Sequence, residues 1–217
     1  MGVATGRSDQ AACFTVDLSY TEILERVNVK KFLILLAAVA LFAGSVLADD
    51  FESIRKAPEL TFTIPGQGQK TLSQYQGKVV ALEFIFTTCP HCQAASHVMS
   101  KLQNEYGSRG LQVIDIAVNP NADLLVENFA KDYHTTFPVG WTTSDKMTTF
   151  MGFQPGRYVV PQLVLIDRKG NIHYQTPATE DSKWDALMKE ENIRAHIEQL
   201  LSAPDAKRLS ANARRSR

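Results

Sequence analysis

The chain has 217 residues with 23 basic and 23 acidic side chains, so its formal charge at pH 7 is zero, and 44% of its residues are hydrophobic. This length and apolar content are sufficient for one domain with a substantial core. The balanced charge gives nucleic-acid binding no support beyond a short basic segment at the C-terminus. The sequence contains no internal repeat and no long low-complexity tract.

Residues 30–48 resemble a secretory signal peptide. Two lysines precede an apolar run from Phe32 to Leu47, and Ala48 closes a cleavage site of small residues. The run is shorter than the ~20 residues needed to span a bilayer. We therefore expect cleavage near Ala48 and a periplasmic or otherwise extracytoplasmic location, with an uncleaved membrane anchor as the alternative.

The sequence divides into four parts. We expect a leader (1–48), a linker (49–56), a folded domain (57–202) and a basic, disordered tail (203–217). Residues 1–26 resemble no common start of a signal peptide, so one hypothesis is that translation begins at Val27. The alternative for the tail is an arm that binds a membrane or a nucleic acid.

Strands and helices alternate in the first half of the domain. Leu60 to Ile64 is predicted to be a strand that ends at a Pro-Gly turn cluster, 65–68. Val79 to Phe86 is short, β-branched and aromatic, which predicts a buried strand. Apolar residues at helical spacing predict a helix from Gln93 to Tyr106, and Leu111 to Val118 is predicted to be a second buried strand.

The alternation continues in the second half. Asp123 is expected to cap a helix whose apolar residues include Leu124, Leu125, Phe129 and Tyr133. The pattern then predicts a strand (Phe137 to Trp141), a helix (Ser144 to Met151), a hairpin (Gln162 to Asp167 with Asn171 to Gln175) and a final helix (Ser182 to Ser202) with a break at Glu190 to Asn192. Together these elements predict a three-layer α/β domain.

Cys89-Pro90-His91-Cys92 lie where the buried strand meets the first long helix. Two thiols on the first helical turn can close a small disulfide ring and reopen it. Cys89 faces the positive end of the helix dipole, which favours its thiolate form. The third cysteine, Cys13, precedes the apolar run, so the mature chain would keep a single pair.

Two other interpretations of the cysteine pair are weaker. A structural disulfide of this size restrains little of the unfolded chain's entropy. A zinc site normally needs a second Cys/His pair, and none follows. His91 and His97 suggest metal ligands, but both also suit solvent-facing or active-site positions on the helix. The sequence therefore favours a redox-active pair that requires no metal and no bound cofactor.

The order of elements, with Cys-x-x-Cys opening the first long helix, resembles the thioredoxin superfamily over about residues 57–202. The Gly77-Lys78 turn and the strand and helix within 123–141 more narrowly resemble the TlpA-like and AhpC/TSA-like redoxins. The Cys-Pro-His-Cys sequence itself is similar to that of DsbA-type oxidants. This resemblance implies a thioredoxin-like α/β sandwich, a central mixed sheet flanked by helices, that exchanges disulfides with proteins.

The resemblance also implies a proton-transfer residue. Glu83 lies six residues before Cys89, where thioredoxin-like proteins often have a buried acid. On an alternating strand its side chain can point beneath the active site toward Cys92 and move a proton to or from that thiol. The alternative is a structural carboxylate paired with a basic side chain such as Lys78.

A third implied feature is the substrate-binding loop. Pro161 matches the cis-proline loop of the superfamily, which faces the disulfide and, with Val160, pairs with a bound substrate chain. The alternatives are a trans proline at a strand start and the competing Pro138, whose strand is too short and is not followed by the hairpin.

The expected function is that of an exported thiol-disulfide oxidoreductase. Cys89 attacks, favoured by His91, and Cys92 resolves the mixed disulfide. We expect a monomer whose partners are cysteine-containing exported proteins and a membrane or soluble redox protein that recycles the pair. The alternatives are a dedicated reductant, as in cytochrome c maturation, and a copper chaperone using both cysteines and a histidine.

The sequence supports two opposite directions of electron flow. The helix N-terminus and His91 both favour the Cys89 thiolate, which predicts an oxidising pair. The TlpA-like frame argues for a reductant. A peroxidase is not indicated, because Leu82 and Phe86 occupy the positions where its signature needs proline and threonine or serine.

Overall fold

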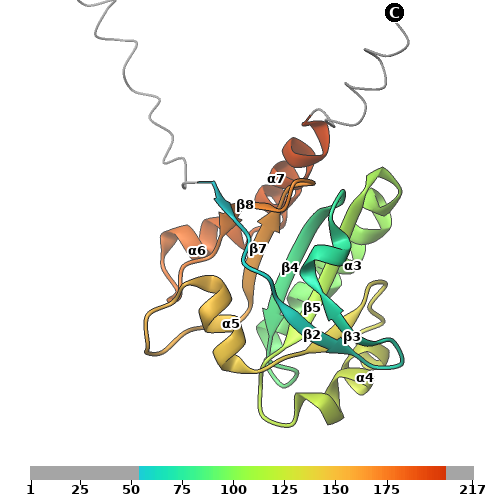
Figure 1. Ribbon diagram of the computed structural model, residues 1–217, viewed down its shortest axis with the longest axis vertical. Coiled ribbons are helices and arrows are strands. Elements are labelled where there is room, and N and C mark those ends of the chain that lie inside the picture. The colour runs from blue at the N-terminus through green and yellow to red at the C-terminus, as the bar shows by residue number, and fades with distance from the viewer. Residues whose placement is uncertain (1–53, 204–217) are drawn as a thin grey trace, which may run out of the picture. The chain divides into compact units, whose positions relative to one another are not determined.

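The computed structural model describes residues 54–203. The expected leader lies outside the described residues, as does most of the expected linker and tail. The described residues form an eight-stranded mixed sheet covered by helices, as the sequence predicted (Figure 1). The strand order is β1-β8-β7-β4-β5-β6-β2-β3.

The centre of the sheet is β4 (Val79–Ile85), whose seven residues are all buried. It pairs in parallel with β5 (Leu111–Ala117) and antiparallel with β7 (Gln162–Ile166). Beyond β5 lies β6 (Val139–Trp141), and beyond β7 lies β8 (Asn171–Gln175). A strand buried on both faces has a nearly continuous apolar sequence, which is why β4 and β5 were predicted correctly.

The edges of the sheet contain three elements that the sequence did not predict. These are β1 (Arg55–Lys56), β3 (Gly68–Thr71) and the 3-10 helix η1 (Leu72–Tyr75). β3 forms a hairpin with β2 (Thr61–Ile64), and β1 pairs with β8. β1 has two residues and β3 is polar and partly exposed, so neither shows the alternation of apolar residues that predicts a strand. They are strands because they pair with β8 and β2 at the edges of the sheet.

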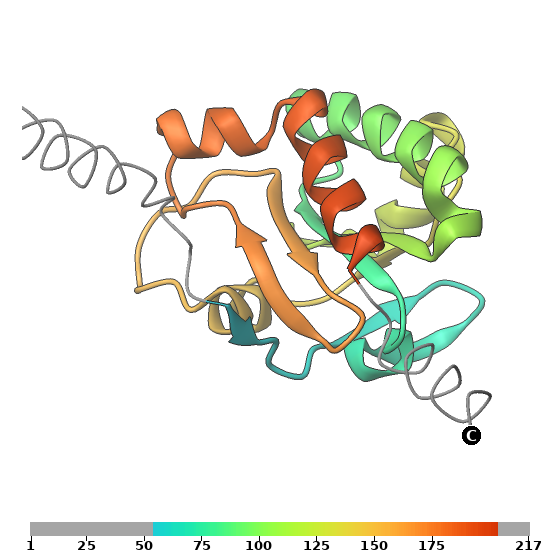
Figure 2. The same cartoon turned by 90° about the horizontal axis from the view of Figure 1, so that it is seen from above.

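Helices cover both faces of the sheet. One apolar cluster joins the odd-numbered residues of β4 to α3 (Pro90–Tyr106), α4 (Ala122–Asp132), α6 (Ser182–Leu187) and α7 (Glu190–Ser202). A second cluster joins the even-numbered residues to β2, η1 and α5 (Ser144–Met151). Figure 2 shows α3, α6 and α7 on one side of the sheet and α5 on the other. Within residues 54–203, none of the helices combines the length and the apolar character needed to cross a bilayer.

The predicted start of α4 is wrong. Its N-cap is Asn121, in the left-handed conformation at φ 58°, and Asp123 lies inside the first turn. The buried face consists of Ala122, Val126 and Phe129. Leu124, expected on the apolar face, is 72% exposed because it projects from the opposite side of the helix.

The predicted last helix is two helices. α6 ends at Leu187 and α7 begins at Glu190, so the break lies at Met188 and Lys189 rather than at residues 190–192. Acidic residues suit the positive N-terminal end of a helix. The Glu190-Glu191 pair therefore starts α7 instead of interrupting it.

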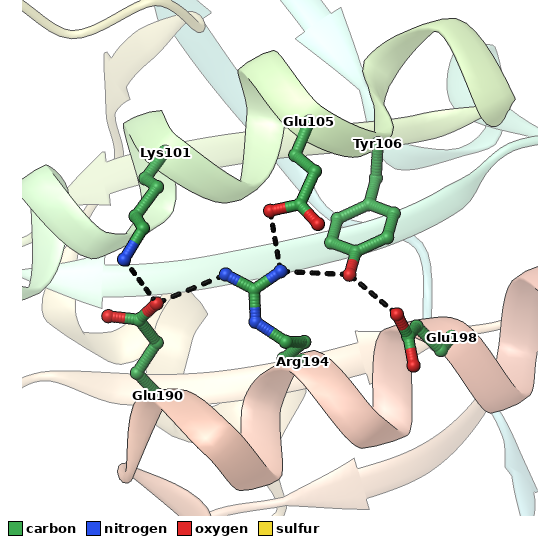
Figure 3. Close-up of polar contacts among 6 residues, drawn as sticks. All are labelled: Lys101, Glu105, Tyr106, Glu190, Arg194 and Glu198. Atoms are coloured by element: carbon green, nitrogen blue, oxygen red, sulfur yellow. Dashed lines mark hydrogen bonds and ion pairs between the residues drawn. The ribbon is translucent and has the colours of Figure 1, made fainter.

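Polar side chains fasten α7 along α3, as Figure 3 shows. The hydroxyl of the buried Tyr106 donates to Glu198 (2.7 Å) and accepts from Arg194 (2.9 Å). Arg194 also donates to Glu105, and Lys101 pairs with Glu190 at 2.7 Å. The charged side chains are between 27% and 61% exposed, so their ion pairs are screened by solvent and stabilise little. Their effect is to orient α7 against the helix that carries the cysteines.

Candidate active site

The two cysteines lie at the start of α3 in different environments. Cys89 is the N-cap residue with extended backbone (φ −87°, ψ 120°), and Pro90 occupies the first turn, where proline is favoured. Cys89 is half-buried and Cys92 is fully buried, and both are free thiols. Burial raises the pKa of Cys92 far above its usual range, and the neighbouring Cys89 and Glu83 raise it further. The structure thus provides one accessible and one protected sulfur.

The histidines of α3 point outward. His91 and His97 are both exposed, and the ring of His97 packs edge-on against Tyr133 at 5.8 Å. Across residues 54–203, no group of three or more His, Cys, Asp or Glu side chains is arranged to hold a metal ion. The copper-chaperone alternative therefore finds no third ligand beside the cysteine pair in this region.

The loop before β7 faces Cys89. The Val160–Pro161 peptide bond is cis, as the resemblance implied, and it is the one cis bond in the described part of the chain. The trans-proline alternative is therefore wrong, and Pro138 does not form such a loop. Cys89 Sγ lies 3.8 Å from the carbonyl oxygen of Val160. The structure thus brings together Cys89, Val160 and Pro161.

Three buried or half-buried side chains hold this loop, and the sequence analysis missed their role. Gln162 Nε2 donates to the carbonyl oxygens of Val159 (2.9 Å) and Pro177 (3.0 Å), and Thr176 donates to Gln162 Oε1. Trp184 Nε1 donates to the carbonyl oxygen of Pro161 at 3.2 Å. The one visible signal was a glutamine, Gln162, directly after the proline and at the start of an apolar strand.

Glu83 lies in the middle of β4 and is completely buried. It is on the side of the sheet that α3 covers, and its charge interacts with those of Cys89 and Cys92. Lys78, the basic partner considered from the sequence, instead donates to Gln112 at 2.9 Å. The structural pairing of Glu83 with Lys78 is therefore wrong.

A second buried acid, Asp115, lies beside Glu83. The two residues are register partners on the parallel strands β4 and β5. Ser96 of α3 donates to Asp115 Oδ2 at 2.6 Å. Burial raises the pKa of Asp115 to about 7 and raises that of Glu83 well above its usual value, to which the charge of Asp115 adds. Asp115 was not predicted from the sequence, although an aspartate between apolar residues of a buried strand was a visible signal.

The fold and the paired thiols define a thioredoxin-like protein of the TlpA-like redoxin type. Residues 53–196 match the model of the Redoxin family, and the chain belongs to that family. Its relatives include the thiol-disulfide oxidoreductase ResA of Geobacillus kaustophilus, 28% identical over 144 residues that cover 66% of this chain and 75% of the relative. ResA of Bacillus thuringiensis is 29% identical over 143 residues, which cover 64% and 80% of the two chains.

Solved structures share the fold. A thiol:disulfide interchange protein from Chlorobium tepidum matches with a TM-score of 0.56 at 22% identity, covering 69% of this chain and 97% of the other. A thiol:disulfide interchange protein from Bacteroides sp. has a TM-score of 0.55 at 14% identity, covering 71% and 93%. The predicted fold class is confirmed. The chain is a protein-disulfide oxidoreductase of this family.

Proposed function

We propose that this chain is an exported thiol-disulfide oxidoreductase in which Cys89 attacks the substrate and Cys92 resolves the mixed disulfide. The observation that carries the proposal is the contrast between the two sulfurs. Cys89 is accessible beside the cis-proline loop, whereas Cys92 is fully buried one turn further along α3. An attacking sulfur must reach another protein, and a resolving sulfur needs only to reach its neighbour.

The exchange proceeds in two displacements. The Cys89 thiolate attacks one sulfur of a substrate disulfide, and the other substrate sulfur leaves as a thiolate. Cys92 then loses its proton and attacks Cys89, which releases the second substrate thiolate. The substrate is reduced and the Cys89–Cys92 pair is oxidised; with a dithiol substrate the same steps run in reverse.

Glu83 is the proposed proton acceptor and donor for Cys92. The thiol of Cys92 is protonated at neutral pH, because burial raises its pKa. It must lose this proton when it attacks Cys89. Glu83 is a buried carboxyl whose charge interacts with that of Cys92, and no basic side chain neutralises it among the described residues. These features support a role in proton transfer rather than in an ion pair.

Val160 and Pro161 are the proposed docking residues for the substrate chain. A groove of about 520 Å³ is lined by Tyr158, two residues before Val160, and by Phe86, three residues before Cys89, together with Trp141 and several polar residues. Phe86 and Tyr158 meet edge to face at 6.3 Å, at the ends of the segments that lead to Cys89 and Val160.

Export is supported by the signal-like pattern of residues 30–48. A disulfide persists outside the reducing cytosol, so an extracytoplasmic location suits a reversible Cys89–Cys92 bond. The proposed mature protein begins near Asp49 and carries its thioredoxin-like domain at 57–202. It needs no bound cofactor, and a redox protein of the membrane or of the same compartment recycles the pair.

Trapping of mixed disulfides tests the assignment of the two cysteines. Cys92→Ala should accumulate a covalent complex with a cysteine-containing peptide, because the step that releases it is blocked. Cys89→Ala should accumulate none. Non-reducing gel electrophoresis and mass spectrometry of the purified full chain measure both variants. Equal trapping by the two variants, or by neither, would contradict the assignment.

A dedicated reductant, as in cytochrome c maturation, is the second candidate function. It is favoured by Cys92, whose thiol is kept protonated by burial and by the nearby Glu83, because stabilising a thiolate is what makes a dithiol pair oxidising. A reduction potential near roughly −270 mV would identify a reductant, and one near roughly −120 mV an oxidant. In an oxidant stabilised by His91, His91→Pro should shift the potential to more negative values; in a reductant it should leave the potential unchanged.

A further inference from the structure

Glu83 and Asp115 form a pair of carboxyl groups inside the protein. They are register partners on parallel strands, and both side chains are 0% exposed. Neighbouring strands lie about 4.8 Å apart, and register partners project from the same face of a sheet. Both carboxyls therefore lie in one layer, between the sheet and α3.

The pair lacks hydrogen-bond donors. Ser96 supplies one, to Asp115 Oδ2. Among the described residues, no donor reaches Glu83 Oε1, Glu83 Oε2 or Asp115 Oδ1. Two ionised carboxylates in contact would repel each other in a medium of low dielectric constant, and unpaired buried oxygens are costly. A proton on one carboxyl, donated to the other, removes the repulsion and supplies a missing donor.

We propose that Glu83 and Asp115 share one proton in the resting protein and form a two-carboxyl relay that accepts the Cys92 proton, with Asp115 and Ser96 as positioning residues. This inference deepens the proposed function and rests on it. Glu83 is the member that interacts with both cysteines. Asp115 acts through Glu83.

The hydroxyl of Ser96 sets where the shared proton lies. By donating to Asp115 Oδ2, it stabilises the ionised form of Asp115 and leaves the proton on Glu83. The negative Asp115 in turn raises the pKa of Glu83. The titratable groups that face Glu83 in the described residues are Asp115, Cys89 and Cys92, so no cation opposes this effect.

In the resolving step, the Glu83–Asp115 pair takes up the proton that Cys92 releases. The S–H proton of Cys92 moves to Glu83 while the Glu83 proton moves to Asp115. The Cys92–Cys89 disulfide bond forms, the bond from Cys89 to the substrate sulfur breaks, and the electron pair leaves with the substrate thiolate. The carboxyl pair gains one proton and becomes neutral as the negative charge departs on the substrate. Reduction of the disulfide runs the same steps backwards.

Infrared spectroscopy tests the shared proton without relying on activity. The native dithiol protein at pH 7 should show the C=O stretching band of a protonated carboxylic acid. Asp115→Asn and Glu83→Gln should each abolish it, because the new amide can donate to the remaining carboxylate. The control is Glu198→Gln, which alters a carboxyl group on α7 that accepts a hydrogen bond from Tyr106 on α3. This variant should retain the band.

Two infrared results would overturn the relay. One is the absence of the band from native protein at pH 7, which decides the matter even if a variant fails to fold. The other is its persistence in folded Asp115→Asn, which would mean that Glu83 holds its proton alone.

The pH profile of the resolving step tests the role of the pair in exchange. Glu83→Gln should slow release of the mixed disulfide by about a hundredfold, the lower end of the range for general acid–base catalysis. Asp115→Asn should move the acidic limb of the profile to lower pH by about one unit or more, because an amide donor replaces a negative charge beside Glu83.

The two hypotheses fail in different ways. An Asp115→Asn profile identical to that of native protein would overturn the relay while leaving the cysteine assignment intact. Absence of disulfide exchange by native protein would instead overturn the proposed function. In that case the infrared band still decides whether the pair shares a proton.

Discussion

At the scale of single residues, the site depends on side chains that hold a backbone loop in place. Gln162 and Thr176 are both 0% exposed, and they connect the loop before β7 to the end of β8. Neither side chain touches a cysteine. Their contribution is to fix the position of Val160, whose carbonyl oxygen faces Cys89.

Thr176→Val should destabilise the protein by about 2 kcal/mol. Valine has nearly the shape of threonine, but it leaves Gln162 Oε1 and the amide of Leu163 without their partner, and unpaired buried groups cost about 1–3 kcal/mol each. Urea denaturation measures the loss. The matched control is Thr149→Val on the exposed face of α5, where a change within about 0.5 kcal/mol is expected. Equal effects at both positions would contradict the role of Thr176.

At the scale of elements, the turn between β7 and β8 caps the last helix. Arg168 Nη1 donates to the carbonyl oxygens of Leu200 (3.2 Å) and Leu201 (3.0 Å), near the end of α7. The last carbonyls of a helix have no partner within it, and a positive charge favours this end of the dipole. Arg168 thus stabilises the end of α7 that lies far from Glu190.

Arg168→Ala should cost about 1 kcal/mol and loosen the last turn of α7. Hydrogen exchange of the amides of that turn should accelerate more than exchange in the first turn, where Arg194 and Lys101 hold Glu190. Lys169→Ala, at the exposed neighbouring position of the same turn, is the control. Uniform acceleration along α7 in both variants would show that Arg168 is not a cap.

Elements with local signals at both ends were predictable from the sequence. α5 occupies the predicted range because Thr143 caps its start and Gly152, at φ 72°, ends it. The hairpin of β7 and β8 was found through its Arg-Lys-Gly turn. By contrast, β1 and β3 are strands because they pair with β8 and β2. No pattern within their own short sequences predicts this pairing.

The candidate site divides in the same way. Cys89, Cys92 and Pro161 belong to motifs that are visible in the sequence. Asp115 and Gln162 contribute to the site because folding buries them beside groups from other segments. A single polar residue in an apolar stretch of sequence does not indicate which group it will contact.

At the scale of the whole molecule, the buried acids link stability to pH. Burial raises the pKa of Asp115 from 3.8 to about 7, and that of Glu83 is raised as well. Between pH 4 and pH 7 the folded protein therefore holds protons that the unfolded chain has released. Stability from this source is fully present at acidic pH and is lost as pH rises through the pKa values of the two groups in the folded protein, which for Asp115 is about 7.

Denaturation in urea at several pH values should show this loss, on the order of a few kcal/mol between pH 4 and pH 7. The double variant Glu83→Gln/Asp115→Asn should lose most of the decline, because both titrating groups are gone. Glu198→Gln should keep it. If the double variant showed the same decline of unfolding free energy with pH as the native protein, other titrating groups would be responsible for it.

The order of strands in the sheet has a consequence for how the chain folds. β4 lies between β5 and β7 in the sheet, yet in the sequence α3, β5, α4, β6 and α5 separate β4 from β7. β2 is likewise far in the sequence from its partner β6. Contacts between such distant segments make folding slow, because large loops must close first. Because the chain is synthesised from its N-terminus, Cys89 and Cys92 are made before the segment bearing Pro161. During this interval the nascent thiols are open to premature oxidation, against which the finished fold protects Cys92.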